Sequence, residues 1–376
     1  THKIYKFYSR PRSIIYTASI LNELLKASIM DHIKFPSINQ FRQIVKSVRD
    51  SANWNNKPVP TITFECTKKV HGSNGSWIRP VNGASDDIVF QSRERICTIE
   101  SDNAGFALWS HGKRQLISKI MDDICRVTGH TTGNVQIYGE WFGGNIQKGV
   151  GVSGLPKMFM IFGIRVSDDA ESTKWEQKSV YEQVFGKMFY AADNIYTKYD
   201  FGVEYVEVDF NKPEFAQNKF VEMTDEVEHD CPVARWFKPD AEVGSLIGEG
   251  IVITPIQTED IGFDVTSHIA KIKGEKHSVS KVKTTKTVDP ERIASIHEFV
   301  EKTATQNRLQ QGLDKMNELG VPVLPASTGV YIQWVVRDIL REEADTMAES
   351  GFEAKDVTGP IANIARKFWM ENISAY

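Results

Sequence analysis

The hydrophobic pattern of this chain changes once, near residue 287, and that change constrains the fold more than any other feature. Before it, apolar residues occur in short stretches with a period of two, as Ile62, Phe64 and Cys66 do. This period is typical of a half-buried strand. After it, apolar residues recur three and four positions apart, as at residues 361–369, which forms one face of an α-helix. The sequence therefore predicts a strand-rich part followed by a helical part.

Four further apolar stretches in the first part are predicted to be strands. They are Ile137–Tyr138, Met158–Phe162, Tyr205–Val208 and Ile251–Ile253. A helical pattern lies between two of them, at Arg114–Val127. Because strands and helices do not alternate regularly, we expect an α+β fold rather than a doubly wound parallel sheet.

The second part follows a linker-like stretch at residues 284–288. Asp289 and Pro290 suit the N-cap and the first position of a helix. Three helical patterns come next, at residues 309–316 before a stop at Gly320, at 332–340 and at 361–369. We therefore place a helical C-terminal domain at residues 287–376.

Composition excludes several classes of protein. The 376 residues include 45 Lys and Arg against 49 Asp and Glu, a net charge of −4, so any nucleic-acid site must be a local patch. No run of about 18 apolar residues is present, which argues against a membrane span. The four cysteines lie far apart without a CxxC pair, which disfavours a zinc ribbon or a disulfide scaffold and fits a reducing compartment.

Residues 1–30 are predicted to be an extension outside the folded domains. The short apolar run Ile14–Tyr16 lacks the continuous apolar region and cleavage site of a secretory signal. We expect a loosely attached amphipathic segment and hypothesise that Met30 is the natural start. An intact mass that includes residues 1–29 would contradict that hypothesis.

The sharpest chemical signal is the string TKKVHGSN at residues 67–74, which ends the first predicted strand. A lysine amine can attack phosphorus only when it is neutral, and nearby cations and partial burial lower its pKa. Gly72 would let the backbone approach a phosphate, and His71 and Asn74 could donate hydrogen bonds to it. On this pattern Lys68 and Lys69 compete as the nucleophile, and an ordinary polar turn would look the same.

The string resembles motif I of the covalent ATP-dependent ligases, in the variant of the RNA ligase 2 family. Five other segments resemble the later motifs of that family, in the same order: Gln91–Arg95, Tyr138–Lys148, Phe159–Phe162, Gly248–Ile253 and Ala270–Lys276. Residues 307–309 and 336–343 also look like its C-terminal helices. Six collinear motifs are far more specific than one. Over residues 31–376 the chain thus resembles a phage-type RNA ligase 2 of the lysyl-nucleotidyltransferase superfamily.

The resemblance implies an antiparallel-sheet nucleotidyltransferase domain, similar to ATP-grasp ligases, at residues 31–286, with a helical domain at 287–376. It implies that a lysine takes AMP from ATP, that AMP moves to an RNA 5′-phosphate, and that a 3′-hydroxyl then displaces AMP. The implied cofactors are ATP and Mg²⁺, with Mn²⁺ as a substitute, and the implied partner is nicked duplex RNA. A monomer without membrane contact is expected, in the cytoplasm, or in the host cytoplasm if the protein is viral.

By resemblance Lys69 is the nucleophile, because the His-Gly-Ser-Asn spacing after it matches the family. Lys271 and Lys273 match the phosphate-contacting lysines, which would neutralise the α-phosphate and help to keep Lys69 deprotonated. They begin a run of six lysines, from Lys271 to Lys286, that also suits binding to a nucleic-acid backbone.

Two acids and an aromatic residue complete the nucleotide site that the resemblance implies. Glu140 matches the acid that contacts the ribose, and Glu249 matches the acid placed near the metal and the lysine. Glu249 is the expected metal ligand, with Glu140 as a second candidate, because carboxylate oxygens suit Mg²⁺. Phe162 matches the aromatic that stacks on adenine, although a Phe in an apolar strand more often belongs to a core.

The other implied contacts come from short polar stretches. Arg93 matches the arginine after motif I, which contacts RNA phosphates or AMP, and Arg95 is its rival two residues later. His71 and Asn74 match motif I positions that orient phosphate and metal. Three positions depart from the family, since Lys68, Gly163 and Thr254 stand where a glutamate, an acid and a lysine are usual.

Three other functions are alternatives. A DNA ligase or an mRNA-capping guanylyltransferase would share the chemistry, but those enzymes append an OB-fold barrel, which would appear as short strands. A non-catalytic protein that binds RNA ends would keep the fold, but the intact Lys69, Glu249 and Lys273 argue against it. An unrelated α+β protein with chance motifs is disfavoured by their order along the chain.

Overall fold

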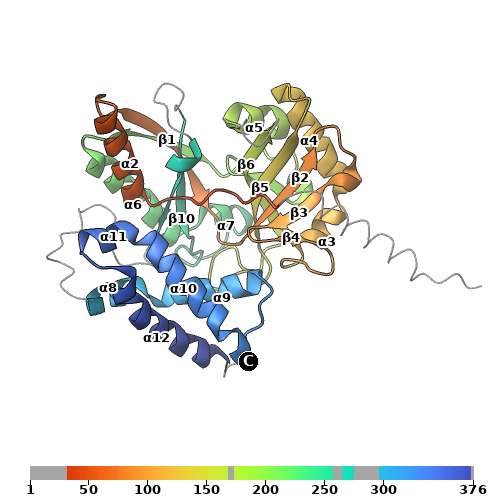
Figure 1. Ribbon diagram of the computed structural model, residues 1–376. Helices are drawn as coiled ribbons and strands as arrows, with labels where there is room; N and C mark the ends of the chain where they lie inside the picture. Colours follow the sequence, from red (N-terminus) through yellow and green to blue (C-terminus); the bar gives the residue numbers. More distant parts are fainter. Residues whose placement is uncertain (1–31, 168–172, 257–264, 275–295, 374–376) are drawn as a thin grey trace, which may run out of the picture.

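A computed structural model describes residues 32–167, 173–256, 265–274 and 296–373 of the chain. Figure 1 shows two β-sheets in neighbouring lobes, with a group of helices lying below both in this view. Every strand pairing is antiparallel except one, among the described residues. The predicted α+β class, with antiparallel sheets and a helical C-terminal part, is confirmed.

The first sheet has four strands and carries the string TKKVHGSN at one end. Its order is β11 (Ala270–Lys273), β10 (Gly250–Pro255), β1 (Thr61–Lys69) and β9 (Val203–Asp209). The helices α2 (Phe41–Trp54) and α6 (Pro213–His229) cover one face, where Phe41 and Phe220 pack with Ile62 and Phe64. The residues of β1 that alternate with Ile62 and Phe64 therefore face the opposite side of this sheet.

The second sheet is larger and holds the main apolar core. Its order is β4 (Ile96–Cys97), β3 (Val89–Ser92), β2 (Ser73–Pro80), β5 (Asn134–Phe142), β6 (Met158–Ser167) and β7 (Thr173–Trp175), with β8 (Ile195–Thr197) parallel to β6. The helices that pack on its outer side are α3 (Phe106–His111), α4 (Arg114–Thr128) and α5 (Lys178–Phe185). Trp77, Trp141 and Phe159 are fully buried between the sheet and these helices.

Two smaller elements join the sheets. Residues 32–40 run from one to the other: the His32 ring lies 3.0 Å from the Ser92 carbonyl, and Asn39 forms a bridge with Ala270. The helix α7 (Pro232–Phe237) packs Val233 and Ala234 against Phe142 of the second sheet.

The C-terminal part consists of helices with an apolar core of their own. They are α8 (Ile296–Thr303), α9 (Gln306–Glu318), α10 (Thr328–Glu342), α11 (Ala344–Glu349) and α12 (Ala354–Ile373). Tyr331, Ile339, Ile361 and Trp369 are buried in that core. The three predicted helices correspond to α9, α10 and α12.

Ion pairs hold the helical domain against the sheets. Arg42 Nη2 of α2 lies 2.8 Å from Glu343 Oε2, and Lys315 Nζ of α9 lies 2.9 Å from Glu94 Oε1. Both sheets are therefore tied to the same group of helices. The predicted boundary at 287, the extension at 1–30, the Asp289 N-cap and the lysines from 276 to 286 lie outside the described residues.

None of the helices within the described ranges combines the length and the apolar character that crossing a membrane requires.

Candidate active site

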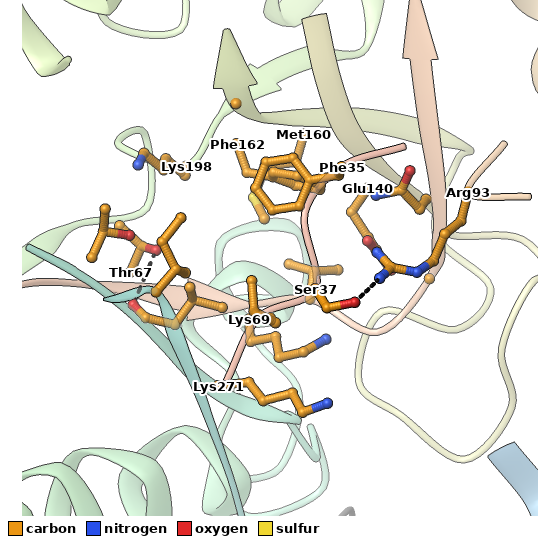
Figure 2. A pocket seen from close by; sticks show the side chains of 18 of the residues that line it. Phe35, Ser37, Thr67, Lys69, Arg93, Glu140, Met160, Phe162, Lys198 and Lys271 are labelled. Carbon is orange, nitrogen blue, oxygen red and sulfur yellow. Dashed lines mark hydrogen bonds between the residues drawn. The ribbon is translucent and has the colours of Figure 1, made fainter. Parts of the chain in front are cut away.

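A cavity of about 620 Å³ lies between the inner faces of the two sheets. Lys69, Thr67 and Glu65 of β1 line it from the first sheet, and Glu140, Met160 and Phe162 line it from the second. Side chains of α9 and α10 close one end. Figure 2 shows the labelled residues pointing into this space from both sides.

Lys69 is the last residue of β1 and makes a direct contact with a carboxylate. Its Nζ lies 2.7 Å from Glu249 Oε2, and the His71 Nδ1 lies 3.3 Å from the same oxygen. Lys68 belongs to the opposite face of the strand and pairs with Glu204 of β9 at 2.8 Å. The two lysines are thus separated by strand alternation, and Lys69 is the one that faces Glu249.

Glu249 is buried at the centre of a group of cations. Lys273 Nζ contacts its second oxygen at 2.9 Å, and only 1% of the Glu249 side chain is exposed. The register explains this convergence, because Gly250 pairs with both Lys69 and Lys273 on the neighbouring strands. Gly250 has φ +138°, and a Cβ there would collide with the Ile272 carbonyl. The close pairing of β10 with β11 thus requires glycine.

These contacts determine the protonation states of Lys69 and Glu249. Burial lowers the pKa of Lys69, but the attraction of Glu249 and Glu140 outweighs burial and raises it above its ordinary value. Burial raises the pKa of Glu249, yet the surrounding cations hold it well below its usual range. The two carboxylates thus favour the protonated form of Lys69, and the expectation that Lys271 and Lys273 help to deprotonate it stays a prediction for the protein with bound nucleotide.

Glu140 approaches the same centre from β5, where it pairs with Asn74 of β2. Burial raises the pKa of Glu140 to about 7, and the positive charge of Lys69 only partly opposes that shift. Gly72 lies beside it, and a Cβ at Gly72 would collide with the Trp141 carbonyl. The motif I glycine thus lets the chain after Lys69 pass directly over β5.

Lys271 and Lys273, the two lysines predicted to contact phosphate, both line the cavity from β11. Lys273 is paired with Glu249, whereas Lys271 Nζ lies 3.2 Å from Glu342 Oε1 of α10. Burial raises the pKa of Glu342, but Lys271 and Arg308 lower it more strongly, to about 2. The helical domain therefore supplies a charged partner to one of the predicted phosphate ligands.

Phe162 lines the cavity from β6, but its ring is not free. Phe35, from the segment that joins the sheets, packs edge-on against it with ring centroids 4.9 Å apart. Gly163 leaves room for this ring, because a Cβ there would lie 2.9 Å from Phe35 Cε2. That packing gives a physical reason for glycine where the family usually has an acid. Thr254 also lines the cavity, and it pairs with Glu65 of β1.

Arg93 and Arg95 occupy different surroundings. Arg93 lines the cavity, and its Nη2 lies 3.4 Å from the Ser37 hydroxyl (Figure 2). Arg95 donates to the carbonyls of Ser101 at 2.5 Å and Asp102 at 2.7 Å, which stabilises the loop after β4. Of the two candidates, Arg93 is the one at the cavity.

Several cavity residues were not predicted from the sequence. Phe35, Glu65 and Lys198 come from separate segments, and Asp314 and Glu318 come from the helical domain. The strand alternation that places Lys69 in the cavity also places Glu65 there, so Glu65 could have been predicted from the sequence. The others depend on contacts between distant parts of the chain.

No group of three or more acidic, His or Cys side chains in the described part of the chain could hold a metal by itself. Glu249 already contacts the ammonium groups of Lys69 and Lys273 and the ring of His71. This donor set fits Mg²⁺ only in the manner of nucleotide enzymes, in which one or two carboxylates act together with substrate phosphates and waters.

Two antiparallel sheets around a lysine-rich cavity define a nucleotidyltransferase domain of the ligase type. The sequence profile of the family described as RNA ligase matches residues 62–273, more than half of the chain. The chain belongs to the RNA ligase family. The match includes Lys69, both predicted acids and both lysines of β11.

No curated protein matches the chain significantly. Among solved structures it is similar to an RNA ligase of Naegleria gruberi. One variant with AMP and Mn has 13% identity and a TM-score of 0.38, covering 65% of this chain and 58% of that one. The form with pyrophosphate has 13% identity and a TM-score of 0.38, covering 65% and 56%. The chain thus spans less than two thirds of these structures.

Proposed function

We propose that this protein is an ATP-dependent RNA ligase that seals nicks with a 3′-hydroxyl and a 5′-phosphate in duplex RNA. The observation that carries the proposal is the contact of Lys69 with Glu249 at 2.7 Å, inside a cavity that Lys271 and Lys273 also line. A buried lysine among acids and further cations suits attack on a phosphate, because each charge in the transition state has a partner.

In the first step the Lys69 amine attacks the α-phosphorus of ATP. A nitrogen–phosphorus bond forms, the bond from the α-phosphorus to the bridging oxygen breaks, and pyrophosphate leaves. Lys69 must lose its proton for this step, so its contact with Glu249 has to loosen when nucleotide binds. Lys273 and Lys271 would then bind phosphate oxygens in place of Glu249 and Glu342.

The next two steps transfer AMP and join the RNA. An oxygen of the RNA 5′-phosphate attacks the AMP phosphorus, and the Lys69 nitrogen leaves. The 3′-hydroxyl then loses its proton and attacks the 5′-phosphorus, which releases AMP and forms the phosphodiester. Arg93 lies at the cavity edge and would neutralise phosphate charge during transfer.

Glu249 would hold Mg²⁺ together with the nucleotide, with Glu140 as a second ligand. The ion would supply positive charge to the phosphate oxygens, and Mn²⁺ would serve in its place. Glu140 would otherwise contact the ribose, and Phe162 would stack on adenine once the Phe35 ring makes room.

The described residues after 296 form helices, which supports an RNA ligase over a DNA ligase or a capping guanylyltransferase with an appended barrel. Duplex RNA is recognised mainly by its shape and its 2′-hydroxyls. The helical domain lines one end of the cavity, next to the reacting groups, and would help to hold a nicked duplex there.

The direct test compares three nicked substrates with ATP and Mg²⁺: duplex RNA, duplex DNA and a single RNA strand with the same ends. The proposal predicts sealing of duplex RNA faster than of the other two. Equal or better sealing of nicked DNA would favour a DNA ligase. Binding of RNA ends without sealing would favour a non-catalytic protein.

A further inference from the structure

A buried polar cluster lies in the same cavity, at the far end from Lys69, and the mechanism above does not use it. Lys198 Nζ lies 2.6 Å from Glu65 Oε1, and the Tyr199 hydroxyl lies 3.0 Å from both carboxylate oxygens. The side chains of Glu65 and Lys198 are 5% and 11% exposed. Burial of an ion pair adds little net stability, because desolvation offsets the attraction. This cluster therefore suggests a role in binding.

The cluster lies where a base would reach. Glu65, Thr67 and Lys69 all line the cavity, while Cys66 between them packs into the core on the other face. The four-residue rise from Glu65 to Lys69 is about 13 Å, comparable to the reach of an extended nucleoside monophosphate. A nucleotide with its α-phosphate at Lys69 would lie along β1 and present the edge of its base to Glu65.

Lys198 is held rigidly beside the aromatic residue that is predicted to stack on the base. Its backbone N–H donates to the Ile161 carbonyl at 2.8 Å, next to Phe162 in the sequence. Its Nζ also lies 5.0 Å from the centre of the Tyr199 ring, a cation–π distance. In Figure 2, Lys198 and Glu140 appear on opposite sides of Phe35 and Phe162.

We propose that Glu65 and Lys198 read the edge of the adenine base and set the preference for ATP over GTP, an inference that rests on the proposed function. The Glu65 carboxylate accepts from the 6-amino group of adenine, and the Lys198 ammonium donates to N1. Guanine in the same pose would turn a carbonyl oxygen toward the carboxylate and an N–H toward the ammonium. Placement of the α-phosphate beside Lys69 and stacking on Phe162 fix that pose, so guanine cannot exchange the two contacts.

Equilibrium binding of AMP and GMP to the full chain tests this without any reaction at Lys69. In the variant Glu65→Gln, the ratio of AMP affinity to GMP affinity is expected to fall by about 10- to 100-fold. This is the effect of one buried hydrogen bond to a charged group. Its amide can turn an NH₂ toward the guanine carbonyl, so binding of GMP should improve relative to AMP. Lys198→Met should lose the preference to a similar extent.

Lys178→Met is the matched control. Lys178 also lines the cavity, its Nζ lies 5.8 Å from the same Tyr199 ring, and it bonds to the Tyr205 hydroxyl at 3.1 Å. The control should keep the preference of the wild type for AMP.

Two outcomes would overturn the inference. If Glu65→Gln and Lys198→Met weaken AMP and GMP equally while the melting temperature falls, the cluster is only a structural link between the sheets. If the wild type binds AMP and GMP equally, no base edge is read here. Selective binding of AMP without covalent labelling of Lys69 would contradict the proposed ligase function but support this inference.

Discussion

Lys69 carries a positive charge in the protein without nucleotide, because Glu249 and Glu140 stabilise its protonated form. The amine that attacks phosphorus has to be neutral. Nucleotide binding must therefore change the surroundings of Lys69 before any bond forms. The phosphates of the nucleotide compete for the same cations that now surround Glu249, which gives that change a physical cause.

The nucleophile can be assigned with two neighbouring variants. Lys69→Ala should abolish covalent attachment of AMP. Lys68→Ala should keep the rate within about twofold, because its partner Glu204 is 47% exposed and surface pairs contribute little. Labelling with radioactive ATP followed by denaturing electrophoresis measures both. If Lys69→Ala is labelled and Lys68→Ala is not, then Lys68 is the nucleophile instead.

The pKa of Glu140 predicts how stability depends on pH. Burial raises the pKa of Glu140 from 4.5 to about 7 in the folded protein, so folding favours its protonated form. That contribution is fully present below pH 4.5 and is lost as pH rises through 7. Relative to the wild type, Glu140→Gln should therefore gain free energy of unfolding between pH 5 and 8, by up to about 3 kcal/mol.

Urea unfolding of the wild type and Glu140→Gln at pH 5 and pH 8 measures this difference. A stability difference between the two proteins that stays constant with pH would show that Glu140 titrates normally.

The sequence predicted the side chains that the motif spacing fixes and missed those that come from elsewhere. Lys69, Glu249 and Lys273 meet as the resemblance implied, because strand register joins them. Phe35 and Lys198 could not be predicted, because their places in the cavity depend on contacts with segments more than 100 residues away.

Among the elements, the pairing of β10 with β11 controls the site, and Gly250 tests it. A Cβ at Gly250 would collide with the Ile272 carbonyl, and its φ of +138° disfavours other residues. Gly250→Ala should lower the free energy of unfolding by at least about 2 kcal/mol and should reduce AMP attachment, because Lys271 and Lys273 move with β11.

Gly329→Ala is the control for that substitution. Gly329 lies in α10 with open space around it, so alanine should stabilise the protein by about 0.5–1 kcal/mol and leave AMP attachment unchanged. Thermal unfolding together with labelling separates the two effects. Equal behaviour of the two variants would show that the β10–β11 pairing tolerates a side chain.

The five predicted strands all lie within observed ones, since alternation in a half-buried sheet is a direct consequence of its geometry. The helices α2 and α6 were not predicted, although Phe41, Ile44 and Val48 carry a helical spacing. The short α11 has only 6 residues, too few for the helical period to become visible.

At the level of the whole molecule, the apolar cores of the two domains are separate. The four core clusters of the sheet part include no residue after Ile272, and the helical core begins at Ile296. Contacts between the domains are largely polar, as in the pairs Arg42–Glu343 and Lys315–Glu94. The sequence predicted a strand-rich part and a helical part but not this docking, because its ion pairs join residues more than 200 positions apart.

Removal of residues 287–376 should therefore leave a folded catalytic domain. We expect this truncated protein to attach AMP to Lys69, while nick sealing should fall by at least about tenfold, the equivalent of one lost charged hydrogen bond. Labelling and sealing assays on the same preparation measure both. Unchanged sealing would show that the helical domain has another role.

The most direct measurement incubates the full chain with Mg²⁺ and α-labelled ATP, with GTP in parallel, and maps the labelled peptide after denaturing electrophoresis. The proposed function predicts an acid-labile label from ATP on Lys69. A label from GTP alone would indicate a capping enzyme instead. No label from either nucleotide, on folded protein that carries no bound AMP, would contradict a covalent ligase and favour a protein that only binds RNA ends.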